Sequence, residues 1–325
     1  MITQDQFNAV VTRANLAPSI HNAQPARWRL RGDVIEVAAS LAVVLPAADP
    51  SGAAIGLSCG AAVEGTVLAL SEIGFGAQVS DVWDDADVHS WSGHRIAARI
   101  AVIGEGRLDP LAAQLARRFT WRGVFMDAPV RLFGWTREDC ALVMDTPTRN
   151  WIAGLNDAAS LGILRNRAFR QELLGWMRLE RKHPRTPYDG LSLAALRIDR
   201  NIAKKVRLGF GPMWSLLDMF GRTKLLTAEA EVTMTAPVLA CFHRPAAESA
   251  IDTGRAYLRF CLEVAQLDMA AWPMAALTDD VQAAQQIKEH LGIGADRKLV
   301  QVLRIGVPTG EQTPRARRPL AELIT

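Results

Sequence analysis

The sequence predicts an α+β fold made of two loosely similar halves. Residues 28–37 alternate in polarity around Gly32-Asp33, which is typical of a β-hairpin with antiparallel strands. Residues 57–73 resemble residues 251–267, and both segments run into a turn and a strand. Because one helix-and-strand pattern occurs twice, we expect two related units within one chain.

The similarity between the two segments rests on few identical residues, but one constant shift along the chain aligns them. A shift of 194 positions places Gly60 on Gly254 and Leu68 on Leu262. The helix predicted over 55–73 is rich in Gly and Ala, and small residues let two backbones approach each other. We therefore expect this helix to pack closely against another one.

Composition places the chain among ordinary globular proteins. Of its 325 residues, 49% are hydrophobic and 22% are charged, and the net charge of +3 is too small to indicate a nucleic-acid partner. The four cysteines are scattered without the spacing of a metal or redox site. We therefore expect no metal. Residues 1–6 do not resemble a secretory signal, so we expect a cytoplasmic protein.

The remaining elements follow from apolar spacing and from capping residues. Thr278 precedes Asp279-Asp280 and an apolar pattern, which predicts a helix over 278–291 with Thr278 as its cap. Further helices are predicted over 4–16 and 151–178, strands over 96–103 and 299–307, and a loop over 81–94.

Two arginines and a threonine form the first candidate site. A helix is predicted to begin at Asp109-Pro110, and past Arg117 the chain favours an extended backbone. Arg118, Thr120 and Arg122 would then share one face, as charge-assisted donors to a terminal phosphate. The alternative is a solvated basic edge on an ordinary helix.

A polar loop forms the second candidate. Residues 18–25 contain Ser19, His21, Asn22 and Gln24, whose side chains can donate and accept hydrogen bonds. Such a loop either connects a helix to a strand or grips a heteroaromatic ligand. The loop alone favours the connection.

Two further stretches contain basic residues or are flanked by them. The apolar, glycine-interrupted residues 208–220 lie between Lys204-Lys205 and Arg222, which favours a core segment or a surface flap over a segment that touches a membrane. The tail at 315–318 carries three arginines. It forms either a solvated end or a return to the phosphate site.

Together these stretches resemble the FMN-dependent nitroreductase family. Arg118-x-Thr120-x-Arg122 is similar to its Arg-x-Ser-x-Arg phosphate motif. Residues 17–25 are similar to its Pro-Ser-x-x-Asn-x-Gln-Pro-Trp loop. Residues 262–276 resemble the helix and turn that face the flavin N5, and Arg315 and Arg317 match a basic pair in its C-terminal tail.

The order of these motifs resembles the fused, single-chain (Acg-like) subgroup, because the polar loop comes before the arginine motif. This resemblance implies a nitroreductase-like fold in which two antiparallel-sheet-plus-helix units mimic the family homodimer. It implies one FMN between a first half over 1–108 and a second over 109–325, with a lid-like insertion at about 180–228. The chain would then be a monomer that acts as a pseudo-dimer, and further association stays open.

The resemblance also implies the residues that hold FMN. Arg118, Thr120, Arg122 and Arg317 would bind the phosphate, with Arg315 a weaker candidate, and Arg122 has the flavin N1–O2 edge as an alternative. The ring would contact Pro18, Ser19 and Asn22 on one side and Pro273, Met274 and Ala275 on the other.

Two positions depart from the family pattern. Ala26 replaces the tryptophan that follows the polar loop, with Trp28 two positions later, and Ala275-Ala276 stands where acidic and glycine residues are usual. The room for substrate and the charge beside the ring therefore differ from the family pattern.

The resemblance implies hydride transfer from NAD(P)H through FMN to a nitroaromatic, a quinone or a similar acceptor. The flavin carries the chemistry, so no catalytic side chain is assigned. Two alternatives stay open at this stage. One is a protein that stores FMN behind a closed lid, and the other is a structural protein that has lost the cofactor.

Overall fold

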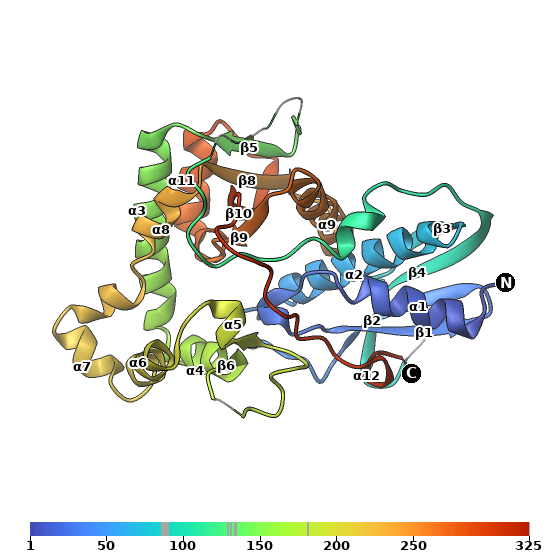
Figure 1. Ribbon diagram of the computed structural model, residues 1–325, viewed down its shortest axis with the longest axis horizontal. Coiled ribbons are helices and arrows are strands. Elements are labelled where there is room, and N and C mark those ends of the chain that lie inside the picture. The colour runs from blue at the N-terminus through green and yellow to red at the C-terminus, as the bar shows by residue number, and fades with distance from the viewer. Residues whose placement is uncertain (86–90, 129, 131, 133–134, 181, 325) are drawn as a thin grey trace.

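The computed structural model describes residues 1–324 except 86–90, 129, 131, 133–134 and 181 (Figure 1). Its first sheet has the strand order β1-β2-β4-β3. These strands are β1 (Ala26–Arg31), β2 (Val34–Ser40), β3 (Phe75–Asp81) and β4 (His94–Glu105), and each neighbouring pair is antiparallel. The predicted hairpin over 28–37 is confirmed, because Trp28 pairs with Val37.

The second sheet repeats this connectivity. Its order is β5-β8-β10-β9, formed by β5 (Cys140–Val143), β8 (Val238–Pro245), β9 (Ala270–Pro273) and β10 (Arg297–Gly306). In both sheets two strands precede a long helix and two follow it, and the fourth strand in the chain lies between the second and the third. The α+β prediction with two half-similar units is therefore confirmed.

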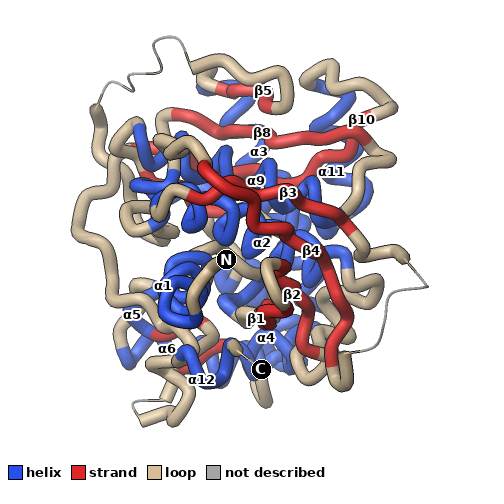
Figure 2. Tube along the Cα trace, turned by 90° about the vertical axis from the view of Figure 1, so that its right-hand side faces the viewer, coloured by secondary structure: helices blue, strands red, loops and turns tan. Residues whose placement is uncertain are grey.

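The helices that lie between the second and third strands of each unit in chain order pack against each other between the sheets. They are α2 (Ala53–Glu72) and α9 (Ala250–Gln266), and Figure 2 shows them in the middle of the molecule. A Cβ atom added to Gly60 would lie 2.2 Å from the carbonyl oxygen of Ile251, and one added to Gly254 would lie 2.1 Å from that of Leu57. These two contacts are related by the same shift of 194 positions, so the weak repeat marks a pseudo-twofold helix crossing.

Helix α2 is the one described helix that is long and apolar enough to cross a membrane. Its apolar window is 78% buried inside the protein, so it serves as a core helix. It packs against β2, β4 and α1 (Gln4–Ala14), while Trp28 of β1 is fully buried and donates to Thr66 at 2.9 Å.

A helical appendage projects from the second unit. It follows α3 (Thr146–Arg165) and comprises α4 (Arg167–Trp176), α6 (Arg200–Phe210), α7 (Trp214–Met219) and the 3-10 turn η3 (Arg222–Leu226) (Figure 1). Between α4 and α6 lie the short parallel pair β6 (Met177–Arg178) and β7 (Leu191–Ser192) and helix α5 (Leu193–Leu196). Helix α8 (Ala230–Thr235) returns the chain to α3.

The C-terminal tail crosses from the second unit to the first. After β10 it runs alongside the polar loop to α12 (Leu320–Leu323), which packs on α1 and β1 (Figure 1). Ile324 forms a parallel bridge with Trp28. The tail therefore lies on both units.

Three predicted helices differ from the structure. The helix expected after Asp109-Pro110 is only the 3-10 turn η2 (Ala112–Leu115). The helix over 151–178 breaks at Asn166, whose side chain caps α4. Thr278 lies inside the short α10 (Ala276–Asp279), and Asp280 caps α11 (Val281–His290), because a carboxylate that binds free amides starts a new helix.

Candidate functional site

The stretch 118–122 is extended, as its sequence predicts. Thr120 forms a parallel bridge with Ala271 of β9, and the Trp121 amide donates to the Ala271 carbonyl at 3.1 Å. Trp121 is buried, while Arg118, Thr120 and Arg122 all line the same two cavities. The alternative of a solvated basic edge is therefore wrong.

The two cavities adjoin each other between the units. The larger has a volume of about 280 Å³ and the smaller about 110 Å³. The larger extends toward α2 and the turn after β9, and the smaller toward residues 190–195 and the C-terminal tail. Six residues line both: Pro18, Ser19, Arg118, Phe119, Thr120 and Arg122.

Four arginines converge on the smaller cavity, and we call them the arginine cluster: Arg118, Arg122, Arg315 and Arg317. Arg118 and Arg317 each donate from Nη2 to the Leu16 carbonyl at 3.1 Å, so two guanidinium groups share one acceptor. Arg122 donates to the Ala195 carbonyl at 3.2 Å. Arg315 donates to the carbonyls of Ala116 and Arg118, which fastens the tail to the stretch 118–122.

The charges of this cluster are not neutralised by the protein. In the described part of the chain, none of the four arginines forms an ion pair, although Glu229 acts on Arg122 from a distance while it is bonded to Arg304. Burial, with the positive charges of Arg118 and Arg315, lowers the pKa of Arg317 to about 9. A concentration of buried positive charge is costly unless an anion compensates it.

Two donors of the cluster also lack partners. The Nε atoms of Arg118 and Arg317 are buried without a hydrogen-bond partner, and Arg118 is 8% exposed. Buried donors of this kind are normally satisfied by protein or by a bound group. An anion with several oxygens, such as a phosphate monoester, fits both the charge and the free donors.

The polar loop is held in a strained conformation. His21, Asn22 and Gln24 have positive φ angles of 48°, 54° and 51°, which non-glycine residues seldom adopt. The Asn22 side chain donates to the Gly190 and Ala316 carbonyls and accepts from Arg317 at 2.8 Å. The polar atoms of the Asn22 side chain are therefore bonded to the protein, and Asn22 holds Arg317 in place.

Gln24 completes this clamp. Its amide nitrogen donates to the Tyr188 carbonyl at 2.8 Å, and its oxygen accepts from the Arg318 amide at 2.9 Å. The loop is thereby attached to both the lid-like insertion and the tail, and its strain is supported from two sides.

Besides His21, the rest of the larger cavity contains groups that the sequence alone did not single out. Helix α9 contributes Tyr257, Cys261 and Val264, which lie at the spacing of one helix face. Two buried polar atoms here have no hydrogen-bond partner, Oε1 of Gln301 in β10 and Nε2 of His21. Burial and the charge of Arg122 lower the pKa of His21 to about 4, so its imidazole is neutral at pH 7.

The turn after β9 reaches the cavity only in part. Pro273 and Ala275 line it, together with Asp279, whose pKa is raised to about 6 by burial and by Asp49. Met274 instead lies in the core of the second unit at 3% exposure. Its amide donates to the Val302 carbonyl at 2.8 Å, so Met274 supports the turn from behind.

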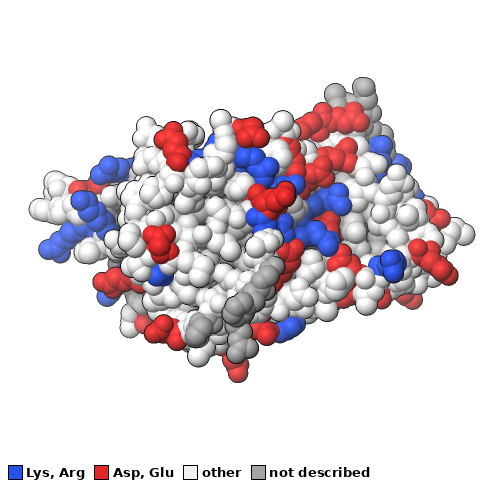
Figure 3. Space-filling model, turned by 90° about the horizontal axis from the view of Figure 1, so that it is seen from above, with Lys and Arg blue, Asp and Glu red and all other residues white. Residues whose placement is uncertain are grey.

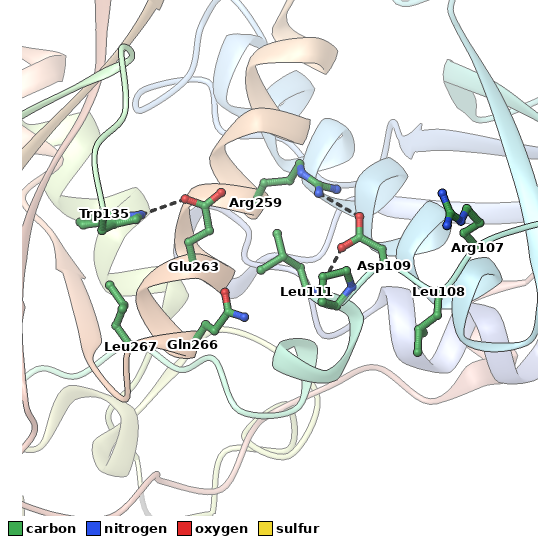
Figure 4. A pocket seen from close by; sticks show the side chains of 10 residues that line it. Arg107, Leu108, Asp109, Leu111, Trp135, Arg259, Glu263, Gln266 and Leu267 are labelled. Atoms are coloured by element: carbon green, nitrogen blue, oxygen red, sulfur yellow. Dashed lines mark hydrogen bonds and ion pairs between the residues drawn. The ribbon is translucent and has the colours of Figure 1, made fainter. Parts of the chain in front are cut away.

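A second hollow lies on the outer surface of α9 and looks different (Figure 4). Its polar groups satisfy one another, since Arg259 bonds to Asp109 at 2.8 Å and Trp135 donates to Glu263 at 2.9 Å. Among the described residues that line this hollow, Arg259 is paired and Arg107 is exposed, so the hollow has no buried, unpaired guanidinium like those of the arginine cluster.

Comparison with known proteins gives one similarity in sequence. No protein-family model matches the chain. A segment of 132 residues is 36% identical to proteins of two Mycobacterium tuberculosis strains, CDC 1551/Oshkosh and H37Rv, whose names give NAD(P)H nitroreductase as a provisional assignment. The match covers 39% of this chain and only 36% of each relative, so it spans about a third of their length.

Solved structures give weaker likenesses. A variant of the FMN- and NADPH-dependent nitroreductase NfnB of a Sphigopyxis strain is 19% identical over 67% of this chain and 98% of its own, with a TM-score of 0.37. NfnB of Mycobacterium smegmatis, solved with NADPH, is 19% identical over 65% and 96%, also with a TM-score of 0.37. At these scores the likeness establishes neither fold nor function.

Proposed function

We propose that this chain binds FMN and is an NAD(P)H-dependent oxidoreductase of the nitroreductase type. The observation that carries the proposal is the arginine cluster, whose buried charges and free Nε donors require an anion beside a cavity between the two units. The sequence similarity to the named nitroreductases supports it.

The phosphate of FMN is assigned to the smaller cavity. Arg118 and Arg317 supply the two free donors, and Thr120 supplies a hydroxyl on the same face. Arg315 contributes charge while it braces the chain through backbone carbonyls, so it binds less directly. Asn22 acts through Arg317 rather than through the ligand.

The flavin ring is assigned to the larger cavity. Pro18 and Ser19 form one wall, and Pro273 and Ala275 form another. The free Oε1 of Gln301 matches an imide N–H of the ring system, and Arg122 provides positive charge for its N1–O2 edge. These residues bind and orient the ring.

A bound FMN would supply the hydride chemistry between a nicotinamide and an acceptor such as a nitroaromatic or a quinone. The protein contributes position and positive charge, and no side chain is assigned a proton-transfer role. Two units in one chain, with one site between them, also support membership of the fused subgroup, with halves over 1–108 and 109–325.

FMN storage is a second candidate, favoured by one observation. Asp189 is buried in the lid-like insertion and bonds to Arg178 at 2.6 Å, Arg185 at 2.7 Å and Arg318 of the tail at 2.8 Å. These bonds hold the insertion against the site, and residues 190–192 line the smaller cavity. A permanently closed insertion would exclude nicotinamide.

The visible spectrum of the purified protein, recorded before and after anaerobic addition of NADPH, tests both candidates. We expect a flavin spectrum that bleaches within the mixing time, as for a reductase. A flavin spectrum that persists supports storage. Absence of flavin after incubation with FMN would overturn both candidates.

A further inference from the structure

The outer side of the helical appendage is unusually apolar. Of the 18 large hydrophobic residues that are exposed in the described part of the chain, seven lie within residues 202–225. Four of them lie on α7 or shortly after it, and we call these the apolar tip: Leu216, Met219, Phe220 and Leu225. Single exposed apolar residues are common, but a contiguous group marks an interaction surface.

The tip arises because α7 is apolar on two sides. Trp214 is buried at 5% exposure against Phe210 and Leu164, and the Arg170 guanidinium lies 4.1 Å from the Trp214 ring centre. Leu216, Met219 and Phe220 lie on the opposite side at the i, i+3, i+4 spacing of one helix face. Packing of the inner side therefore leaves the outer side exposed.

The side chains of the apolar tip are exposed to solvent and are not part of a core. Met219 is 70% exposed, Phe220 66% and Leu225 77%. The sequence favoured a core segment or a surface flap for 208–220, and the structure places Phe210 and Trp214 in a core but the tip in solvent.

The segment that carries the tip has an excess of basic residues. Residues 199–226 contain six Lys or Arg and two Asp, and both Asp side chains are engaged within the appendage. Asp199 caps α6, and Asp218 accepts from Thr223 at 2.9 Å. At the end of the molecule where Figure 1 places α6 and α7, Figure 3 shows Lys and Arg side chains beside uncharged surface, with Asp or Glu side chains among them.

We propose that this appendage docks on an anionic lipid bilayer, with the apolar tip inserted at the headgroup level and the lysines and arginines around it on the lipid charges. Apolar side chains at a protruding end with a basic surround are the chemistry that a bilayer surface takes up. The proposal is independent of the proposed function, because it uses no residue of the arginine cluster.

Flotation of the full-length protein with vesicles tests this inference. We expect binding to phosphatidylcholine vesicles that contain phosphatidylglycerol, weaker binding at high salt, and none to phosphatidylcholine alone. The variant Leu216→Ser/Met219→Ser/Phe220→Ser/Leu225→Ser should lose about tenfold or more in partitioning. Because these side chains are exposed, its far-UV spectrum and melting temperature should match the wild type.

The matched control is Leu41→Ser/Val44→Ser, which removes two equally exposed apolar residues elsewhere, at 58% and 62% exposure. This control should bind vesicles like the wild type. Wild-type protein that ignores anionic vesicles, or a tip variant that binds as well as the wild type, would overturn the proposal. So would a dimer by light scattering that the tip variant converts to monomer without any vesicle binding, since the tip would then join two copies.

Discussion

At the scale of single residues, the buried charges of the arginine cluster lower the stability of the ligand-free protein and favour the binding of an anion. Burial lowers the pKa of Arg118, and no described carboxylate offsets its charge. A binding site of this kind is destabilising when empty, because its charge is complementary to a ligand rather than to the protein.

We therefore expect Arg118→Met to have two opposite effects. FMN affinity should fall about 100-fold, because a charge-assisted bond to phosphate is lost, whereas riboflavin affinity should change less than about threefold. The flavin-free variant should melt at a higher temperature than the wild type, since one uncompensated buried charge is gone. Flavin fluorescence titration and thermal unfolding measure the two effects.

The control for this experiment is Arg107→Met, an exposed arginine beside the hollow on α9. It should change neither affinity nor melting temperature. Equal losses of FMN and riboflavin affinity in Arg118→Met would show that Arg118 does not bind the phosphate.

His21 gives the protein a pH dependence whose sign follows from its lowered pKa. Its pKa is about 4 when folded and 6.5 ordinarily, so the unfolded chain binds more protons between these values. The stability that this neutral histidine preserves at pH 7 is lost as the pH falls from 6.5 toward 4, by about 3 kcal/mol.

Urea unfolding at several pH values checks this expectation. The variant His21→Asn keeps a residue that tolerates the φ angle of 48°, and it should show a smaller loss of stability over the same range. Identical pH profiles for the two proteins would contradict the assigned titration.

At the scale of elements, the crossing of α2 and α9 depends on two glycines. We expect Gly60→Ala to destabilise the protein by about 3 kcal/mol, because its Cβ would lie 2.2 Å from a backbone oxygen that cannot move freely. Gly254→Ala should behave in the same way. Thermal or urea unfolding measures the change.

Gly154 in α3 is the matched control, since nothing lies within 4 Å of its added Cβ. Gly154→Ala should stabilise by about 0.5–1 kcal/mol through helix propensity. A neutral Gly60→Ala would mean that the two helices are farther apart than the structure places them.

The Asp189 hub, formed by Asp189 with Arg178, Arg185 and Arg318, joins residues 178–192 to the C-terminal tail. Burial alone would raise the pKa of Asp189, but hydrogen bonds from Arg185 and Arg178 outweigh burial and lower it. Asp189→Asn should cost about 3–5 kcal/mol, because it leaves buried Arg178 without its carboxylate. It should also expose the insertion to trypsin.

The comparison variant is Glu180→Gln, which breaks a pair with Arg207 between two exposed side chains. Its cost should stay below about 1 kcal/mol, as for surface pairs generally. Trypsin cleavage at an unchanged rate in Asp189→Asn would show that the hub does not hold the insertion closed.

At the scale of the whole molecule, the two units should unfold together. The α2–α9 crossing and the tail both connect the units, and α12 packs on the first one. Calorimetry should therefore show one transition, with equal calorimetric and van't Hoff enthalpies. Two resolved transitions would show that the halves over 1–108 and 109–325 fold independently.

The sequence by itself determined what depends on local spacing. It predicted the β-hairpin, α2, α9 and the extended backbone at 118–122, because alternation, helical periodicity and β propensity act within a few residues. The sequence alignment that places Gly60 on Gly254 also corresponds to a symmetric pair of close contacts in the helix crossing. The boundaries at Asn166 and Asp280 were missed, because a polar side chain there competes for free amides.

Only the tertiary structure decided which distant groups meet. Arg317 and Asn22 are 295 positions apart and bond at 2.8 Å, while Met274, expected at the ring, lies in the core. Burial, free donors and the exposed tip depend on how whole elements pack, and periodicity carries no record of that packing. The arginines were visible in the sequence, but their missing counter-charge became visible only where the two units and the tail converge.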